Sequence, residues 1–231
     1  MYSGEWSVDD PKSPARLRRS LGRLPMFPLP DVVLFPHALL PLHIFEPRYY
    51  DMIKDAVDGS RFIVMAQRLE PESWDEGPPP RVATIAGVGE IVLCQELPDR
   101  RFHVVLFGRG SMRIARERST DKPYRMVSGE LVPDETPTDL AALAEAESSL
   151  RALVENLADA LPEGGSLLKH VAAAQHSPTE LVDVMASALL VEPAERQALL
   201  ENTDVLSRFE HISAAAAAMA VRVPRGDRPA N

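Results

Sequence analysis

The side chains that could carry chemistry in this sequence are six histidines and a single cysteine. The histidines are scattered, and no two stand four residues apart, the spacing at which a helix presents two imidazoles to one metal ion. A metal site built on His37 and His43 would need carboxylates brought in by the fold. We therefore expect neither a metal ion nor a cofactor.

Cys94 lies in "EIVLCQ", between apolar residues that read as the middle of a strand. A nucleophilic cysteine needs a base or a helix N-terminus beside it, and the sequence shows neither, so a core cysteine is expected. The sequence contains no phosphate-binding G-x-x-x-x-G-K-[ST] loop, no G-x-S-x-G nucleophile elbow and no H-E-x-x-H zinc motif. No catalytic residue is predicted, although a peptidase built on Cys94 or on a serine beside a histidine stays open as an alternative.

Charge is spread unevenly along the chain, which has a formal net charge of −9 over 231 residues. Residues 134–220 hold 4 basic and 15 acidic side chains, whereas residues 24–133 hold 13 basic and 15 acidic ones. Within 100–125 the balance reverses, with eight Lys or Arg against two acidic residues. The acidic half argues against nonspecific nucleic-acid binding by the whole chain. The basic stretch leaves open a local nucleic-acid surface beside the simpler interpretation of a solvated hairpin face.

The elements that would position these residues begin after a polar stretch rich in Ser, Pro and Arg, for which we expect a flexible tail over 1–22. This stretch lacks the apolar core of a secretory signal, and no apolar run in the chain reaches the ~18 residues that cross a membrane. A single cysteine allows no internal disulfide, so a cytoplasmic protein is expected.

Prolines then favour extended, edge-like chain, and "DVVLF" (31–35) predicts a short strand. Pro47 predicts the first turn of a helix over 46–58, which Gly59 closes. "RFIVMAQ" (61–67) predicts the next strand, and the segment 70–81 is interpreted as either a lid or a tolerated insertion.

Residues 82–133 predict strands throughout, because apolar residues alternate or run together between turn signals. The turn signals are "LPDR" (97–100) and "GRGS" (108–111). Successive antiparallel strands at this spacing indicate a small barrel or sandwich. The two glycines of "AGVGE" (86–90) predict a bulge or a bend.

Residues 134–220 predict a helical bundle with short connections. Asp139 is the expected N-cap of a long helix, "SPTE" (177–180) is a capping box, and Thr203 is the expected cap of the last helix. The apolar 3–4 spacing of the long helix suits an intramolecular seam and also a coiled-coil dimer, which leaves the oligomeric state open. A second flexible tail is expected over 221–231.

Taken together, several motifs resemble the N-terminal, substrate-binding domain of the Lon protease family. "LPMFPLPDVVLFPHALLPLHIFEPRYYDMI" resembles the opening of that domain, and "FHVVLFGRGSMRI" is similar to its glycine hairpin. "ELVDVMASALLVEPAERQALLENTDVLSRFEHI" resembles its helical end. The resemblance covers roughly residues 23–215 and implies an α+β protein. A PUA-like pseudobarrel with one short helix would occupy 23–133, and a helical bundle would occupy 134–220.

The resemblance also implies a stand-alone bacterial-type member without the ATPase and protease modules of Lon. Such a protein is expected to bind unfolded or extended polypeptide, or a protein partner, without catalysis and with no role at a membrane. A groove where the two parts meet would offer a concave site. The residues expected to line it are Pro36, Phe45, Arg48 and Tyr49. The alternative is a nucleic-acid-associated module that uses the basic region 100–125.

Overall fold

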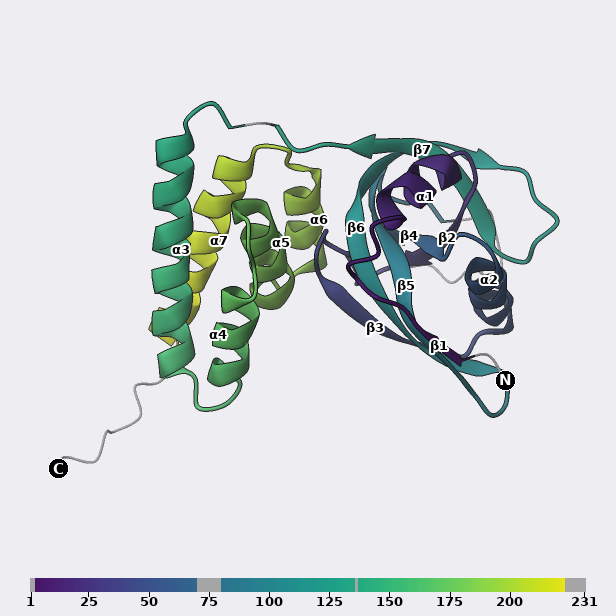
Figure 1. Cartoon of the computed structure of the whole chain (residues 1–231), viewed down its shortest axis with the longest axis horizontal. Helices are drawn as coiled ribbons and strands as arrows, with labels where there is room; N and C mark the ends of the chain where they lie inside the picture. Colours follow the sequence, from purple (N-terminus) through teal and green to yellow (C-terminus); the bar gives the residue numbers. More distant parts are fainter. Residues whose placement is uncertain (1–2, 70–79, 136, 223–231) are drawn as a thin grey trace. The chain divides into compact units, whose positions relative to one another are not determined.

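The computed structural model describes residues 3–69, 80–135 and 137–222, and it divides into two compact units (Figure 1). The first unit combines 1–133 with Glu192–Glu201, and the second combines Asp134–Val191 with Asn202–Asn231. The elements are β1 (Ser3–Glu5), α1 (Ser13–Ser20), β2 (Leu24–Leu29), β3 (Leu39–Ile44), α2 (Pro47–Asp58), β4 (Phe62–Gln67), β5 (Ile85–Leu97), β6 (Arg101–Arg118), β7 (Arg125–Val132), α3 (Leu140–Ala160), α4 (Gly165–Ala173), α5 (Pro178–Leu189), α6 (Pro193–Glu201) and α7 (Val205–Arg222). The protein is therefore α+β, with the strands in one unit, as the sequence predicts.

The strands of the first unit pair in the order β1-β5-β4-β2-β7-β6-β3, and a further pairing joins β5 to β6. These pairings close a cycle through β5, β4, β2, β7 and β6. All five strands of the cycle contribute to one buried hydrophobic cluster, which therefore lies within the cycle. Leu17 of α1 also belongs to this cluster and is 3% exposed.

The N-terminal residues differ from the expected flexible tail over 1–22. Residues 3–5 form β1, which pairs antiparallel with β5, and residues 13–20 form α1. Ser13 and Leu17 of α1 are buried. Two distant partners anchor this polar segment, namely the hydrophobic cluster and the buried carboxylate of Glu90. Its own composition gives no sign of either.

The predicted strand over 31–35 is wrong, because the structure pairs 24–29 and 39–44 as strands and leaves 31–35 irregular. Leu34 and Phe35 are nonetheless buried, at 2% and 0% exposure. Their carbonyl oxygens lie against Gly87 and Gly108, where an added Cβ would collide with them. Residues 31–35 are therefore held by packing against two glycines and not by pairing in the sheet. A short apolar run in the sequence looks the same in both cases.

The turn predicted at "GRGS" is also wrong, since β6 runs unbroken through 108–111. A register shift opposite Val88 and Gly89 pairs those residues with Gly110 and Gly108 and leaves Arg109 as the extra residue. This irregularity confirms the bulge predicted from the two glycines of β5. A bulge redirects a side chain, and here Arg109 Nε reaches the Glu90 carboxylate at 2.7 Å.

The predicted helix over 46–58 is confirmed as α2, with Pro47 in its first turn and Gly59 at its C-cap. Its apolar side packs on the strands: Tyr49 contacts Phe27 with ring centroids 4.2 Å apart, and Tyr50 stacks on Phe102 at 4.8 Å. The predicted strand over 61–67 is confirmed as β4, which is buried along its whole length. Of the expected loop 70–81, residues 70–79 lie outside the described residues.

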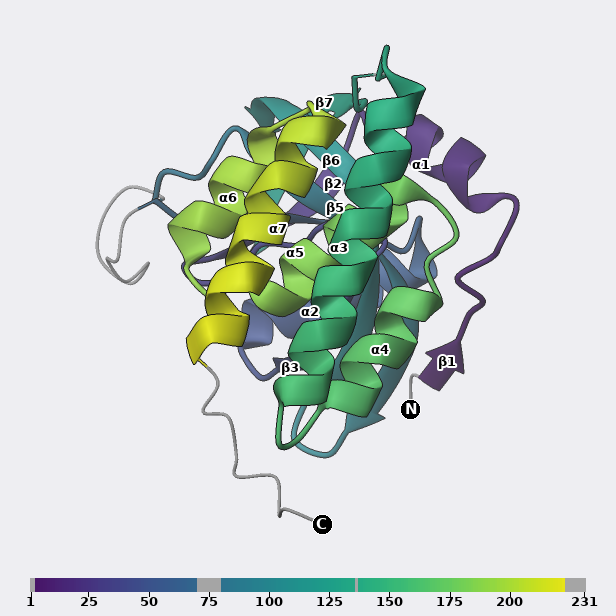
Figure 2. The same cartoon turned by 90° about the vertical axis from the view of Figure 1, so that its left-hand side faces the viewer.

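In the second unit α3 packs along α7 and α4, and α5 packs on α7 (Figure 2). Asp139 caps α3 as predicted, and Ser177 caps α5 by accepting a hydrogen bond from Glu180 N–H. Asp204, rather than the predicted Thr203, caps α7. Helix α4 begins at Gly165, shortly after the C-cap of α3 at Leu161, and the sequence does not predict it as a separate helix.

The second unit contains a buried ion pair in which Arg208 donates to Asp183 at 2.6 Å and contacts Asp134 at 2.8 Å. Burial raises the pKa of Asp183 to about 7, although Arg208 acts in the opposite direction. This carboxyl group therefore titrates near neutral pH.

Helix α6 clusters with the first unit, whereas the sequence predicts that its residues belong to the bundle over 134–220. Two hydrogen bonds explain the grouping. Gln197 Nε2 donates to the Ile85 carbonyl at 2.9 Å, and Arg196 donates to the Val33 carbonyl at 3.2 Å.

Among the described helices, none is long and apolar enough to cross a membrane.

Candidate functional site

An apolar surface lies along β3 and its C-terminal end in the first unit. It consists of Leu39, Pro41, His43 and Phe45, which we call the β3 rim. All four are exposed, and Leu39 and Phe45 are 59% and 65% exposed. The intervening Leu40, Leu42 and Ile44 are half-buried or buried. β3 therefore carries apolar or aromatic side chains on both faces, whereas a strand that only closes a core would alternate with charged or other polar residues.

The backbone of the β3 rim faces an uncovered edge. β3 pairs with β6 alone among the described strands. Gly108 N–H donates to the Ala38 carbonyl, and antiparallel alternation then directs the backbone groups of residues 39, 41 and 43 away from β6. Pro41 contributes only a carbonyl to this edge. The unpaired groups and the exposed apolar side chains thus come from the same residues.

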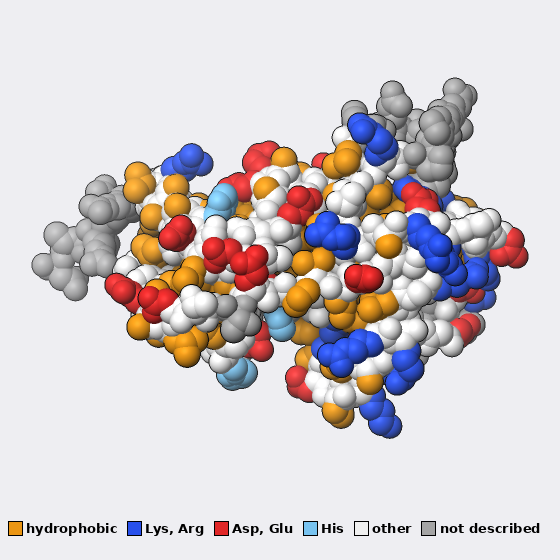
Figure 3. Space-filling model, turned by 90° about the horizontal axis from the view of Figure 1, so that it is seen from above, with side chains coloured by type: hydrophobic (Ala, Val, Ile, Leu, Met, Phe, Trp, Pro, Cys, Tyr) orange, Lys and Arg blue, Asp and Glu red, His pale blue; other side chains and the backbone are white. Residues whose placement is uncertain are grey.

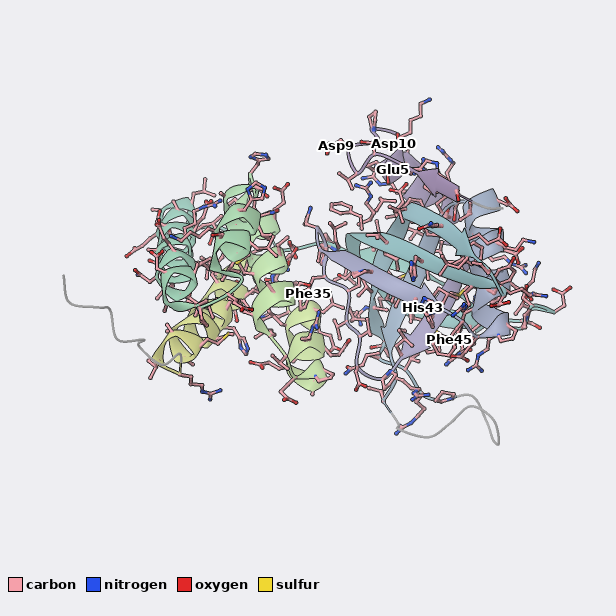
Figure 4. The ribbon with its side chains drawn as sticks, turned by 90° about the horizontal axis from the view of Figure 1, so that it is seen from below. Glu5, Asp9, Asp10, Phe35, His43 and Phe45 are labelled. Carbon is pink, nitrogen blue, oxygen red and sulfur yellow. The ribbon has the colours of Figure 1, made fainter. Side chains whose placement is uncertain are left out.

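Aromatic rings gather at one end of the β3 rim. The His43 ring stacks on Phe45 with centroids 6.2 Å apart and meets His103 of β6 edge-on at 5.0 Å. Figure 4 shows His43 and Phe45 next to each other, with Phe35 away from them. The β3 rim therefore offers aromatic contact area beside strand backbone, which suits an extended polypeptide.

The four binding residues predicted from the sequence occupy different environments in the structure. Phe45 belongs to the β3 rim. Arg48 donates to Glu46 at 2.6 Å, and its guanidinium lies 4.8 Å from the centre of the Tyr49 ring, which is 4% exposed. Pro36 is half-buried at Gly108. Arg48 and Tyr49 are thus brought together in a local structural contact, and a binding role for Pro36, Arg48 and Tyr49 stays a prediction.

The candidate binding residues predicted from the sequence do not include Leu39, Pro41 or His43. The signal was present in "LLPLHIF" (39–45), where every residue on both strand faces is apolar or aromatic. That pattern beside a proline is also typical of a buried strand, so the sequence alone does not separate the two interpretations.

A buried ionic cluster links α1 to the strands of the first unit. Glu90 of β5 is 0% exposed and accepts hydrogen bonds from four side chains. The donors are Ser13 at 2.5 Å, Arg16, Arg61 at 3.1 Å and Arg109 at 2.7 Å. Asp10 lies 2.9 Å from Arg16, and Figure 4 shows Asp9 and Asp10 on this N-terminal segment. Three guanidiniums around one buried carboxylate fix α1 to the strands.

A hollow of about 400 Å³ lies beside the end of α1, between α2 and β7. Two of its lining side chains bond to each other, because Tyr124 donates to Asp55 at 2.5 Å. Lys122, which is not among the lining residues, contacts the same carboxylate at 3.0 Å. Burial and the bond to Asp55 raise the pKa of Tyr124 well above its ordinary value. A phenol held protonated in this way has no base or nucleophile to offer.

Two further possibilities for chemistry are a cysteine nucleophile at Cys94 and a metal site. Cys94 is 2% exposed, and burial raises the pKa of its thiol to about 11, as expected for a core cysteine. Among the described residues, no group of three His, Cys, Asp or Glu side chains could hold a metal ion.

Lys and Arg side chains gather on the first unit in Figure 3. Five of the eight cations in 100–125 form ion pairs there: Arg100 with Asp51, Arg101 with Asp99, Arg109 with Glu90, Lys122 with Asp55 and Arg125 with Glu117. Ion pairing lowers the positive field available to a phosphate backbone.

These features define an α+β domain with an exposed apolar strand edge. The chain belongs to the family of the ATP-dependent protease La (LON) substrate-binding domain, whose model matches residues 23–215.

Relatives and solved structures agree with this assignment. This chain is 29% identical to the Lon protease of Rhizobium meliloti (strain 1021) over 192 residues. The aligned region covers 80% of this chain and 23% of that protein. The Lon protease of Koribacter versatilis is 28% identical over 195 residues, 82% of this chain and 23% of that protein. This chain therefore spans about a quarter of the length of these relatives.

The fold is similar to the N-terminal domain of the Mycobacterium avium complex Lon protease. The TM-score is 0.64 at 20% identity, covering 84% of this chain and 98% of that one. A Lon N-terminal domain protein from Xanthomonas campestris gives a TM-score of 0.53 at 23% identity, covering 83% and 97%.

Proposed function

We propose that this protein is a non-catalytic polypeptide-binding module whose β3 rim holds an extended, partly apolar chain. The observation that carries the proposal is the coincidence of an uncovered strand edge with exposed Leu39 and Phe45. An extended peptide that joins a sheet edge gains backbone hydrogen bonds, and alternate side chains give it specificity. Membership of a substrate-binding domain family supports a polypeptide as the occupant.

We further propose that the closed strand cycle is the PUA-like pseudobarrel expected from the resemblance, and that the module serves as an accessory in proteolysis or protein quality control. The closed pairing of the five strands supports the first point. The relatives' name, Lon protease, supports the second. The absence of catalysis is supported by the buried, protonated Cys94.

The test is binding of a fluorescently labelled, permanently unfolded protein, such as reduced and carboxymethylated α-lactalbumin, measured by anisotropy. Leu39→Ser with Phe45→Ser is expected to weaken binding about tenfold or more, since each 1.4 kcal/mol lost is tenfold. The matched control is Leu140→Ser with Leu167→Ser, which removes two equally exposed leucines from α3 and α4 and is expected to leave affinity within about twofold. Equal losses in both variants would refute the β3 rim as the site.

The same assay with a labelled single-stranded RNA decides the alternative function. A nucleic-acid module would bind it at low salt and lose affinity steeply as salt rises. Because ion pairs occupy most cations of 100–125, we expect no such binding.

A further inference from the structure

A second strand edge in the first unit is covered only by the N-terminal residues of the chain, among those the structure describes. The pairing of β4 with β5 ends at Glu90. Beyond it, β1 pairs with residues 93–95 of β5, and Trp6 N–H donates to the Val92 carbonyl at 2.8 Å. Residues 3–6 thus fill the edge of β5, and they lie outside the family match over 23–215.

The two parts of the N-terminal segment are held with unequal strength. β1 has three residues, and none of them is buried. By contrast, α1 places Leu17 in the hydrophobic cluster, and its buried Ser13 bonds to Glu90. Short, exposed elements with few buried contacts open locally at low free-energy cost. β1 can therefore leave β5 while α1 stays in place.

The contacts of β1 are selective for side-chain size and type. A Cβ added at Gly4 would collide with the Trp6 indole ring, which lies over the same face of the strand two residues on. That indole ring stacks 4.7 Å from the guanidinium carbon of Arg61, a cation–π contact. Arg61 is 9% exposed and is fixed by its bond to Glu90. An aromatic ring that stacks on Arg61 in this way therefore needs a small residue two positions before it in the same strand.

We propose that residues 92–95 of β5 form a strand-acceptor site for an extended polypeptide with the pattern small–any–aromatic, and that residues 3–6 of this chain are its resident occupant. A polypeptide with this pattern displaces β1, takes over its backbone hydrogen bonds and stacks its aromatic ring on Arg61. This site is separate from the β3 rim and does not depend on the function proposed for it.

The experiment uses the full chain in a released and a locked form. Because Trp6 bonds to Val92, alternation makes Gly4 and Cys94 a hydrogen-bonded pair, so Gly4→Pro with Trp6→Ala removes a donor and the aromatic anchor. Ser3 and Gln95 then face each other as a non-hydrogen-bonded pair, with Cα atoms about 4.5 Å apart, a spacing that a disulfide can bridge. Ser3→Cys with Gln95→Cys is the lock.

The probe is a fluorescein-labelled peptide of sequence SGEWSV, the residues 3–8 of this chain. We expect the released form to bind it about tenfold or more tightly than the wild type, and to bind a peptide with alanine in place of tryptophan more weakly. The oxidised lock is expected to show no binding, and reduction is expected to restore the wild-type value. Leu39→Ser with Phe45→Ser is expected to leave this binding unchanged.

Two results would overturn the proposal. One is a released form that keeps its circular dichroism spectrum yet binds SGEWSV no better than a scrambled peptide. In that case β1 only shields an edge from aggregation. The other is an oxidised lock that binds as well as the wild type at high peptide concentration. This second comparison also decides the matter if the released form does not fold.

Discussion

Replacing Glu90 with glutamine tests how the first unit is held together. The Glu90 carboxylate is 0% exposed and accepts from Ser13, Arg16, Arg61 and Arg109. In Glu90→Gln one carboxylate oxygen becomes an NH₂ group, which faces guanidinium donors. Arg16 and Arg61 still have the Asp10 carboxylate as an ion-pair partner, at 2.9 and 3.6 Å. Arg109 loses its carboxylate partner, and its side chain is only 15% exposed.

Removing one partner of a buried ion pair typically costs 3–5 kcal/mol, so we expect the free energy of unfolding of the first unit to fall by about 3 kcal/mol. The assay is urea unfolding followed by tyrosine fluorescence in a Trp6→Phe, Trp74→Phe background. Tyr49, Tyr50 and Tyr124 of the first unit are 4%, 7% and 5% exposed, so their fluorescence reports unfolding of its core. Glu5→Gln, the same change at an exposed position of β1, is the matched control. A loss below about 1 kcal/mol, the value of an exposed pair, would refute the reasoning.

Three further outcomes follow from individual side chains. A thiol reagent at pH 8 is expected to leave Cys94 unmodified in the native chain and to label it in urea, because burial raises its pKa to about 11. Burial raises the pKa of Asp183 from 3.8 to about 7, so between these two pH values the folded state keeps a proton that the unfolded state has lost. The free energy of unfolding therefore falls as pH rises from about 4 to about 7. Asp183→Asn should flatten the fall in melting temperature between pH 4 and 7, and an unchanged slope would contradict the assignment. Gly108→Ala pushes a Cβ into the Phe35 carbonyl, so it should lower the urea midpoint by an amount that corresponds to a loss of about 1–3 kcal/mol in the free energy of unfolding. The control Gly22→Ala places its Cβ in open space and should leave the midpoint unchanged.

Local signals predicted much of the fold because their causes are local. Pro47 and Gly59 bound α2, Asp139 caps α3, and the two glycines of β5 flank the register shift at which Arg109 of β6 is the extra residue. Each depends on residues a few positions apart, which a single sequence displays.

The misplaced elements depend on partners far along the chain. Residues 31–35 are buried against glycines of β5 and β6, and α1 is anchored by Glu90, 77 positions from Ser13. The polar sequence of 1–22 carries no apolar period that would betray such contacts. Phe45 was predicted to line a binding groove because it belongs to the proline- and phenylalanine-rich entry of the chain, and this role stays a prediction. The rest of the β3 rim could not be predicted, since exposure of an apolar strand face is set by what the fold leaves uncovered.

Hydrogen–deuterium exchange of the full chain with and without saturating reduced, carboxymethylated α-lactalbumin tests the central claim most directly. A strand that docks on the β3 rim would protect backbone amides there, including those of Leu39 and His43, which point to the open edge. We predict slower exchange in the peptide segment 39–45, with little change in α3 or α4. Protection confined to the helical unit, or none within 39–45 at saturation, would contradict the account.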